Sequence, residues 1–174
     1  MPEQENEHPR PMVGVSVLVK KGDRILLEKR TKGPMKGAWK EPGGHMEFGE
    51  TPEQTAAREV QEELGVTLTD IKFRCITNDV FEADNKHYIT IWMEAHIASN
   101  EPELKAPYEE SDIGWFTWDS LPEPLYLSLQ HLLDGQTYPS QTTDTKIGGA
   151  IETTPILPGA GSEALGGERD LELE

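Results

Sequence analysis

Cysteine, basic side chains and long apolar runs are all scarce in this chain. Cys75 is the single cysteine among 174 residues, so no disulfide can form within the chain, and its apolar surroundings predict a core residue. No apolar run approaches the length of a transmembrane helix and no signal segment is recognised, so we expect a cytoplasmic protein with no membrane partner. The 16 basic residues are outnumbered by 32 acidic ones, and the net charge of -16 argues against a nucleic-acid polymer as ligand.

The pattern of apolar residues predicts one α/β domain at residues 12–137 between two polar ends. Residues 1–11 and 138–174 are predicted to be disordered, because both are polar and the second is rich in Gly, Thr, Pro and Ser. Short or alternating apolar runs predict extended segments within the domain at 13–19, 24–30, 39–41, 46–48, 71–77, 87–97 and 115–118. With helices expected at 52–64 and 124–133, the order gives an α/β/α sandwich around a mixed sheet.

The stretch GHMEFGETPEQTAAREVQEELGV, residues 44–66, is the most informative part of the chain. Thr51 followed by Pro52 is a typical helix start, and Gln54 completes a capping box. Gly65 is expected to end the helix in a left-handed conformation. One face of this helix would pack on a sheet through apolar residues at four-residue steps, Ala56, Val60 and Leu64.

Three glutamates crowd another face of the same helix. Because Glu59, Glu62 and Glu63 lie three and four residues apart, their charges repel one another unless a cation neutralises them. A hard divalent cation with oxygen ligands, Mg²⁺ or Mn²⁺, is the natural partner. The alternative is an ordinary solvated acidic face. Arg58 and Glu50 favour the metal, since they can orient a metal-bound carboxylate.

The turn Pro42-Gly43-Gly44 before the helix supports the same interpretation. Its two glycines allow a backbone carbonyl to approach a metal without obstruction by side chains. Residues 44–66 fit the pattern Gly-x5-Glu-x7-Arg-Glu-U-x-Glu-Glu-x-Gly-U, where U is aliphatic. This pattern is the Nudix box, so the chain resembles the Nudix hydrolases, metal-dependent enzymes that cleave diphosphate linkages attached to an organic group.

The resemblance extends over roughly residues 12–133. The runs GAWKEPGGHMEFGE, TNDVFEADNKHYITI and WFTWDSLPEPL resemble the MutT-type nucleotide diphosphatases, in the subgroup of the human type 15 and plant type 1 enzymes. This subgroup implies the Nudix fold, a homodimer and hydrolysis of nucleoside triphosphates, oxidised purine nucleotides among them, to monophosphate and diphosphate. Sanitation of the nucleotide pool is the role that the resemblance implies. Some plant members act instead on a terpenyl diphosphate.

Matched residue by residue, the resemblance implies metal ligands on the helix and the turn. Glu59 and Glu63 match the metal-binding carboxylates, and Gly43 matches the carbonyl ligand. Glu62 matches a third glutamate that binds the metal directly or through water.

The catalytic base is expected to be a carboxylate that takes a proton from the attacking water. Glu62 is the first candidate. Glu109 or Glu110 could act as the base or as an extra ligand, or could be ordinary exposed acids of a loop. Arg58 and Glu50 complete the catalytic set as orienting residues.

Substrate contacts are expected around the same turn and on neighbouring strands. Gly44 and His45 are expected to face the phosphates. Arg30 either contacts phosphate or forms a surface ion pair. Thr90 lies where the subgroup lines its base pocket, although a β-branched strand residue can be purely structural.

The final helix departs from the subgroup pattern. A tryptophan that can stack on the base is often found there, and Leu127 takes its place beside Tyr126. Leucine has no ring, which leaves room for an apolar group such as a terpenyl chain. ADP-ribose hydrolysis and removal of an RNA cap are weaker alternatives. A domain that binds a diphosphate without cleaving it would be expected to lose one of the box acids, and none is missing.

Overall fold

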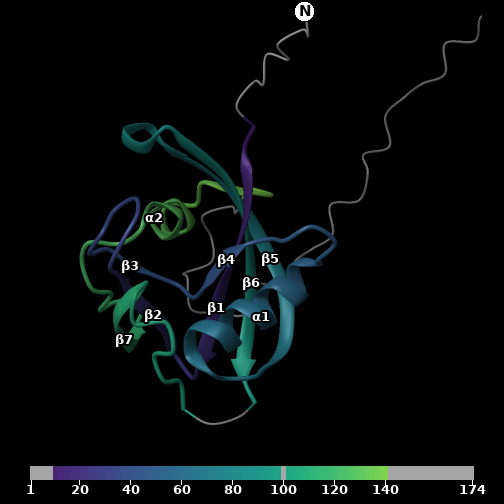
Figure 1. Cartoon of the computed structure of the whole chain (residues 1–174), viewed down its shortest axis with the longest axis vertical. Helices are drawn as coiled ribbons and strands as arrows, with labels where there is room; N and C mark the ends of the chain where they lie inside the picture. Colours follow the sequence, from purple (N-terminus) through teal and green to yellow (C-terminus); the bar gives the residue numbers. More distant parts are fainter. Residues whose placement is uncertain (1–9, 99–100, 141–174) are drawn as a thin grey trace, which may run out of the picture.

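The computed structural model describes residues 10–98 and 101–140 (Figure 1). Most of the predicted terminal disorder, over residues 1–9 and 141–174, therefore lies outside the described residues. Neither α-helix in the described part of the chain is long and apolar enough to cross a membrane.

Strand β1 (Met12–Lys21) organises the sheet, because other strands pair along both of its edges (Figure 1). Its parallel partner is β6 (Lys86–Ile97). Two strands pair antiparallel with it, β4 (Gly43–His45) near its start and β2 (Arg24–Arg30) at its end. The Gly-Gly turn is thereby built into the middle of the sheet as a strand.

Four further strands complete the sheet, β3 (Trp39–Lys40), β5 (Leu68–Phe81), β7 (Glu110–Thr117) and β8 (Thr137–Tyr138). β3 and β7 pair with β2, whereas β5 pairs with β6 and β8 pairs with β5. Among the pairs of named strands only β1 and β6 run parallel, so the sheet is mixed, as predicted.

Two helices cover opposite faces of this sheet, α1 (Pro52–Leu64) and α2 (Leu127–Leu133) (Figure 1). Alternating side chains of β1 and β2 divide between the two layers. The core under α1 contains Val15, Val17, Val19, Leu26, Ala56, Val60 and Leu64. The core under α2 contains Leu18, Ile25, Leu27, Trp39, Cys75, Trp92, Leu129 and Leu132. The predicted α/β/α layering and the packing of Cys75 in the core are confirmed.

The predicted extended segments at 71–77 and 87–97 left a polar loop at 78–86, and this loop is wrong for most of its length. β5 continues to Phe81 and β6 begins at Lys86, so the connection shrinks to a 3-10 turn, η1 (Glu82–Asp84), and Asn85. The strand periodicity continues here through polar side chains, which an apolar pattern alone does not reveal.

Two other predicted strands are displaced. The extended piece expected at 46–48 lies instead at Gly43–His45, where the backbone pairs with β1. The strand expected at 115–118 begins already at Glu110, because it follows β2 as far as Arg30.

The second helix starts later than its sequence suggested. It was predicted at 124–133 and begins at Leu127. The backbone N–H of Trp39 donates to the carbonyl of Pro124 (2.8 Å), and the N–H of Tyr126 donates to the carbonyl of Trp39 (2.8 Å). These bonds hold the segment extended beside β3, so its first residues are not free to turn into a helix.

The domain also extends slightly past its predicted end at residue 137. In β8, Thr137 pairs with Thr77 and Tyr138 pairs with Ile76. Thr137 is buried, with 3% of its surface exposed. One residue of the predicted tail therefore belongs to the sheet.

A chain that ends at residue 140 should keep the stability of the full chain, whereas one that ends at residue 136 should lose β8. Removing β8 uncovers the edge of β5 and deletes the buried Thr137, with an expected loss of about 1–2 kcal/mol in the free energy of unfolding. Thermal unfolding measures the difference, and the shorter chain should melt about 3–8 °C lower. If both truncated chains melt equally low, the tail stabilises the domain and its predicted disorder is wrong.

Candidate active site

The ends of helix α1 are built as its sequence predicts. The Thr51 hydroxyl accepts a hydrogen bond from the backbone N–H of Gln54 (3.3 Å), and the Gln54 side chain accepts one from the N–H of Thr51 (2.9 Å). Gly65 ends the helix in the left-handed region, at φ 68°. The capping box and the glycine cap together fix the helix in register with the residues that precede it.

The three box glutamates do not share one environment. Glu63 is 7% exposed, and the side chain of Glu59 is 15% exposed. Both line the same cavity, as their four-residue spacing implies. Glu62 instead points outward, with 62% of its side chain exposed and an oxygen 3.6 Å from Nη1 of Arg58. Of the three helix glutamates predicted as ligands, only Glu59 and Glu63 therefore line the cavity.

The Gly-Gly turn lies directly against Glu63. The backbone N–H of Gly43 donates to Oε2 of Glu63 (2.9 Å). Gly43 has φ 139°, and a Cβ there would lie 2.1 Å from the carbonyl oxygen of Val15, so only glycine fits. The carbonyl oxygen of Gly43 accepts a hydrogen bond from Nζ of Lys40 (3.3 Å). The ammonium of Lys40 also donates to Oε1 of Glu63, so it contacts both the predicted carbonyl ligand, Gly43, and one predicted carboxylate ligand, Glu63.

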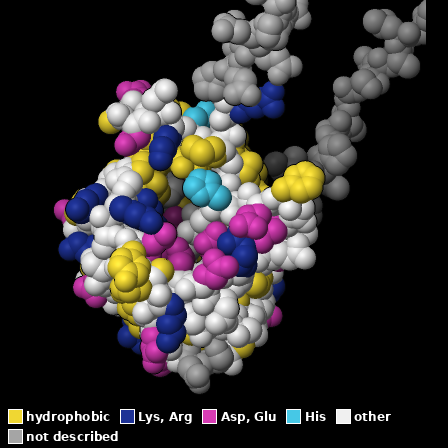
Figure 2. Space-filling model, in the orientation of Figure 1, with side chains coloured by type: hydrophobic (Ala, Val, Ile, Leu, Met, Phe, Trp, Pro, Cys, Tyr) yellow, Lys and Arg dark blue, Asp and Glu magenta, His cyan; other side chains and the backbone are white. Residues whose placement is uncertain are grey.

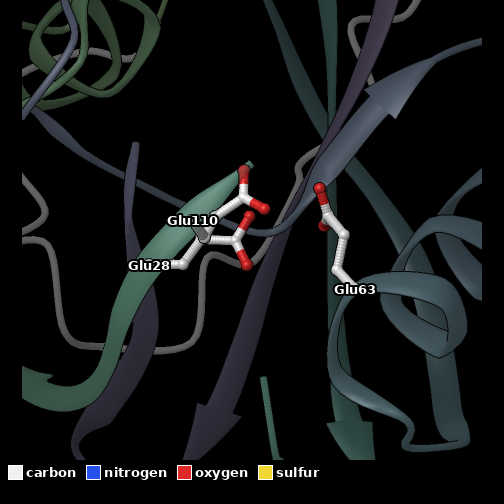
Figure 3. A group of neighbouring side chains, drawn as sticks. All are labelled: Glu28, Glu63 and Glu110. Atoms are coloured by element: carbon white, nitrogen blue, oxygen red, sulfur yellow. The ribbon is translucent and has the colours of Figure 1, made fainter. Parts of the chain in front are cut away.

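Three buried carboxylates from separate elements converge beside the turn. Glu28 of β2, Glu63 of α1 and Glu110 of β7 each offer an oxygen within 4.8 Å of the others. We name this group the carboxylate cage. Figure 3 shows Glu28 and Glu110 facing Glu63 across a narrow space. The structure thereby makes Glu110 a buried acid, whereas Glu109 is half exposed and pairs with Lys32 (2.8 Å).

The ammonium of Lys40 lies inside the carboxylate cage. It contacts Glu28, lies 3.1 Å from Oε1 of Glu63 and lies 3.8 Å from Oε1 of Glu110. Burial alone would lower the pKa of Lys40, but the negative charges of Glu28, Glu63 and Glu110 raise it above its usual value. Lys40 therefore stays charged as long as the cage surrounds it.

Burial has the opposite consequence for the acids. It raises the pKa of Glu63 to about 8, against the opposing charge of Lys40, and raises the pKa of Glu110 to about 7. Burial also raises the pKa of Glu28. Ionisation of all three acids would thus place more negative charge in the carboxylate cage than one buried ammonium can stabilise.

These residues fit a divalent cation. Oε2 of Glu28 and Oε2 of Glu110 are buried and have no hydrogen-bond partner in the described part of the chain. Unpaired carboxylate oxygens cost free energy when buried, and oxygen donors with excess negative charge are what Mg²⁺ and Mn²⁺ prefer. The cage and the neighbouring Glu59 would supply such donors.

Arg58 connects the predicted orienting residues. Its Nε and Nη2 donate to the two oxygens of Glu50 (2.7 and 2.9 Å), Nη1 donates to Glu59 (2.8 Å), and Nη2 donates to the carbonyl of His45 (3.0 Å). Hydrogen bonds from Arg58 lower the pKa of Glu50 to about 2. Arg58 can therefore hold Glu59 in one orientation at the edge of the cavity.

A cavity of about 520 Å³ opens above these groups. Its lining includes the buried Lys40, Glu63 and Glu110 and the largely buried Glu59, which we call the floor. It also includes the exposed Lys32 and Lys86 and the half-buried Arg30, which we call the mouth. Figure 2 shows acidic side chains at the bottom of the hollow, with Lys and Arg side chains beside it. A protein of net charge -16 thus presents positive charge where an anionic ligand would enter.

Aromatic rings form one wall of the cavity. Phe81 packs against Tyr126 and Tyr88, with ring centroids 5.1 and 5.8 Å apart. The guanidinium of Arg30 lies over the ring of Tyr126 at 4.8 Å, and Nε2 of His45 lies 3.3 Å from the Tyr88 hydroxyl. Arg30 is thus a cavity residue held by an aromatic ring, and a flat group has surfaces on which to stack.

The predicted substrate residues divide into those inside and those outside this cavity. Five of them line the cavity, namely Arg30, Gly44, His45, Thr90 and Tyr126. Tyr126 and Ser128 line the cavity and Leu127 does not, so the position of Leu127 gives its predicted substrate contact no support. Tyr126 is the N-cap of α2, with an extended backbone at φ -68° and ψ 149°, so the first helical residue is directed elsewhere.

Sequence reasoning missed Glu28 and Lys40. Lys40 lines the cavity and contacts Glu28, which does not line it, and the two residues lie directly opposite one another in the pairing of β2 and β3. One signal was available, because period-two alternation puts Glu28 on the same face as the buried Leu26. An acid at such a position needs a partner, although the sequence alone does not say which one.

Residues 8–135 match the family described as the NUDIX domain, and the chain therefore belongs to the Nudix family. The finer assignment to the subgroup of the human type 15 and plant type 1 enzymes stays a prediction.

Two curated relatives and one solved structure show the range of the similarity. The chain is 32% identical over 158 residues to the NAD-capped RNA hydrolase NudC of Pseudomonas aeruginosa, an alignment that covers 88% of this chain and 51% of the relative. It is 31% identical over 113 residues to the ADP-ribose pyrophosphatase of Methanocaldococcus jannaschii, covering 65% of this chain and 66% of the relative.

The solved structure is that of the MutT NUDIX hydrolase from Burkholderia pseudomallei. Its TM-score is 0.69 at 33% identity, covering 72% of this chain and 98% of that one. The chain thus spans about half the length of the NudC relative and nearly the whole of the solved structure.

Gly44→Ala tests whether Glu59 is a metal ligand. A Cβ at Gly44 would lie 2.4 Å from the Glu59 carboxylate, which must then leave its place beside Arg58. Displacing a ligand or its support should lower Mn²⁺ affinity about 10–100-fold, as titration calorimetry can measure. Gly14→Ala is the matched control, because its Cβ would lie 3.7 Å from its nearest neighbour, the carbonyl oxygen of Gly44, which is an ordinary contact. Unchanged Mn²⁺ affinity in Gly44→Ala would remove Glu59 from the ligand set.

Proposed function

We propose that this chain is a divalent-metal-dependent hydrolase that cleaves a diphosphate linkage in a small nucleotide. One observation carries the proposal: two acids of the carboxylate cage, Glu63 and Glu110, line the floor of a cavity that has an aromatic wall and a basic mouth. A metal at the floor, a diphosphate above it and a base against the wall would each have suitable surroundings. Membership of the Nudix family and the complete box support the same activity.

The residues of the site have separable tasks in this proposal. Arg30, Lys32 and Lys86 at the mouth attract the phosphates by charge. Glu59 and Glu63, with the Gly43 carbonyl, are the proposed ligands. When bound there, Mg²⁺ or Mn²⁺ would stabilise charge on the phosphate oxygens and lower the pKa of a coordinated water.

The proton of the attacking water needs a carboxylate within reach. Glu110 is better placed for this task than Glu62, because Glu110 lines the cavity while Glu62 is exposed outside it. A group that accepts a proton must approach the water to hydrogen-bond distance, so the position of a candidate base is considered before its pKa. Glu110 is therefore the first candidate for the base. The exposed position of Glu62 does not favour the role that the sequence suggested for it.

Nucleoside triphosphates are the first candidate substrates. The products would be a nucleoside monophosphate and inorganic diphosphate. The similarity to a MutT hydrolase over almost its entire length supports this candidate. ADP-ribose or an NAD-type dinucleotide is the second, since one curated relative is named as an ADP-ribose pyrophosphatase and the other as a hydrolase of NAD-capped RNA. Both classes join a nucleoside to a phosphoanhydride, which the aromatic wall and the basic mouth suit. A terpenyl diphosphate loses its sequence argument, because Leu127 lies outside the cavity and rings line the wall.

Glu63→Gln should abolish most activity while leaving the fold intact. Loss of a metal ligand removes stabilisation of phosphoryl charge, and we expect kcat to fall at least about 100-fold. Because burial raises the pKa of Glu63 to about 8, a neutral amide should be tolerated in the metal-free fold. Steady-state hydrolysis with Mg²⁺ and thermal unfolding measure the two effects.

Glu62→Gln is the matched control for this experiment, because Glu62 is on the same helix but exposed. Its activity should stay within about tenfold of the parent rate if it is only a water-mediated ligand. A Glu63→Gln enzyme with the parent rate would remove Glu63 from the active site, whatever substrate is used.

Tyr126→Leu tests whether the substrate carries a flat group. The substitution keeps an apolar side chain but removes the ring that packs on Phe81 and supports Arg30. Base stacking on an aromatic ring contributes about 1–3 kcal/mol, so KM for a nucleotide should rise roughly 5- to 100-fold. Tyr108→Leu, at an exposed tyrosine outside the cavity, should leave KM unchanged. Equal KM values for both variants would exclude a base on this wall.

The substrate is best identified with a panel in Mg²⁺ that includes nucleoside and deoxynucleoside triphosphates, their oxidised forms, ADP-ribose, NAD and a terpenyl diphosphate. The largest kcat/KM identifies the class. If no member is hydrolysed while Mn²⁺ still binds, the chain is a binding module rather than an enzyme. The homodimer that the resemblance implies can be checked by light scattering on the same sample.

A further inference from the structure

Lys40 occupies an unusual position for a lysine. Only 6% of its side chain is exposed, and Glu28 lies opposite it in the β2–β3 register, so the backbone directs the ammonium into the carboxylate cage. Its Nζ contacts Glu28 and lies 3.1 Å from Oε1 of Glu63. It also donates to the carbonyl of Gly43 at 3.3 Å. A lysine buried among acids at this depth is held there by charge.

The partners of this ammonium include proposed metal ligands. The Glu63 carboxylate and the Gly43 carbonyl are the same two groups that would hold a divalent cation. Mg²⁺ binds oxygen at about 2.0–2.1 Å and demands nearly ideal geometry around it. An ammonium hydrogen-bonded to both groups fills part of that coordination shell, and its positive charge repels the incoming ion.

We propose that Lys40 is an internal cation that occupies the metal position in the metal-free protein and withdraws when a divalent metal binds. The inference rests on the proposed metal-dependent function. Lys40 also lines the cavity, so its flexible side chain has open space into which the ammonium can move.

This exchange has a consequence for each state of the protein. Without metal, Lys40 stabilises the fold, because the acids of the carboxylate cage would otherwise be buried with no cation among them. With metal, the free energy needed to displace Lys40 weakens the observed affinity. The site is then filled only at metal concentrations higher than its bare carboxylates would require.

Lys40→Met separates these two effects, because methionine keeps much of the apolar stem but carries no charge. We expect Mn²⁺ to bind this variant about tenfold or more tightly than the parent chain, since a repelling charge is gone. The metal-free variant should also melt at a lower temperature, and Mn²⁺ should raise its melting temperature by more than it raises that of the parent. Titration calorimetry and thermal unfolding of the full chain give both results without any substrate.

Lys32→Met is the matched control. Lys32 lines the same cavity and its loss changes the net charge equally, but its carboxylate partner is Glu109, outside the carboxylate cage. Its Mn²⁺ affinity should stay within about threefold of the parent value, the size of a screened long-range effect.

Chemical labelling tests the withdrawal in the parent chain, and it remains informative if Lys40→Met fails to fold. Acetic anhydride modifies accessible amines, and mass spectrometry reports the modification of each lysine. Lys40 should react slowly without metal and at least about fivefold faster with saturating Mn²⁺, while exposed Lys32 reacts equally in both states.

The outcomes distinguish this inference from the proposed function. If the parent and Lys40→Met bind Mn²⁺ equally, or the variant binds it more weakly, Lys40 does not compete with the metal and the inference is wrong. Unchanged labelling of Lys40 would mean that the ammonium stays beside the metal, which also overturns it. If neither chain binds Mn²⁺, the proposed metal-dependent function fails together with the inference.

Discussion

The burial of three acids around one ammonium is the constraint on which the site depends. Glu28, Lys40, Glu63 and Glu110 come from β2, β3, α1 and β7, four elements that are separate in the sequence. Charged groups can leave water only when their partners are well placed, so each of these elements is restrained relative to the others. The backbone N–H of Gly43 adds a direct bond to Glu63 and ties the helix to the middle of the sheet. The residues under the candidate active site therefore also connect β2, β3, α1 and β7.

Charge is distributed differently over the surface and around the cavity. The net charge of -16 repels anionic polymers, whereas Arg30, Lys32 and Lys86 make the mouth of the cavity locally basic. A small phosphorylated molecule can exploit this local field, while a long polyanion would also meet the acidic surroundings. The rings of Phe81 and Tyr126 add apolar surface beside the charged floor. Under the proposed function, different parts of one cavity would select the size, the charge and the flatness of the substrate.

Local signals in the sequence predicted the helix caps, most strands, the layering and the box residues around Arg58. They worked because capping, alternation and the box are patterns of neighbouring residues. Glu28 and Lys40 were missed because only the pairing of two strands places them opposite each other. The start of α2 was misplaced because hydrogen bonds with Trp39 hold the preceding segment extended. Leu127 was assigned by analogy to a family position, and the N-cap geometry of Tyr126 decided its direction instead.

The parallel pairing of β1 with β6 has a consequence for the order in which the domain can form. Residues 12–20 pair with residues 88–96, so β1 leaves the ribosome long before its partner. Val17 and Leu18, buried on opposite faces of β1, have no complete layer to pack against until β6 is added. Pairing across such a separation costs loop-closure entropy before any contact between the strands stabilises it. This cost slows folding, and the apolar surface of β1 stays exposed in the meantime. The core under α1 can close once β6 is made, whereas the core under α2 must wait for Leu129 and Leu132.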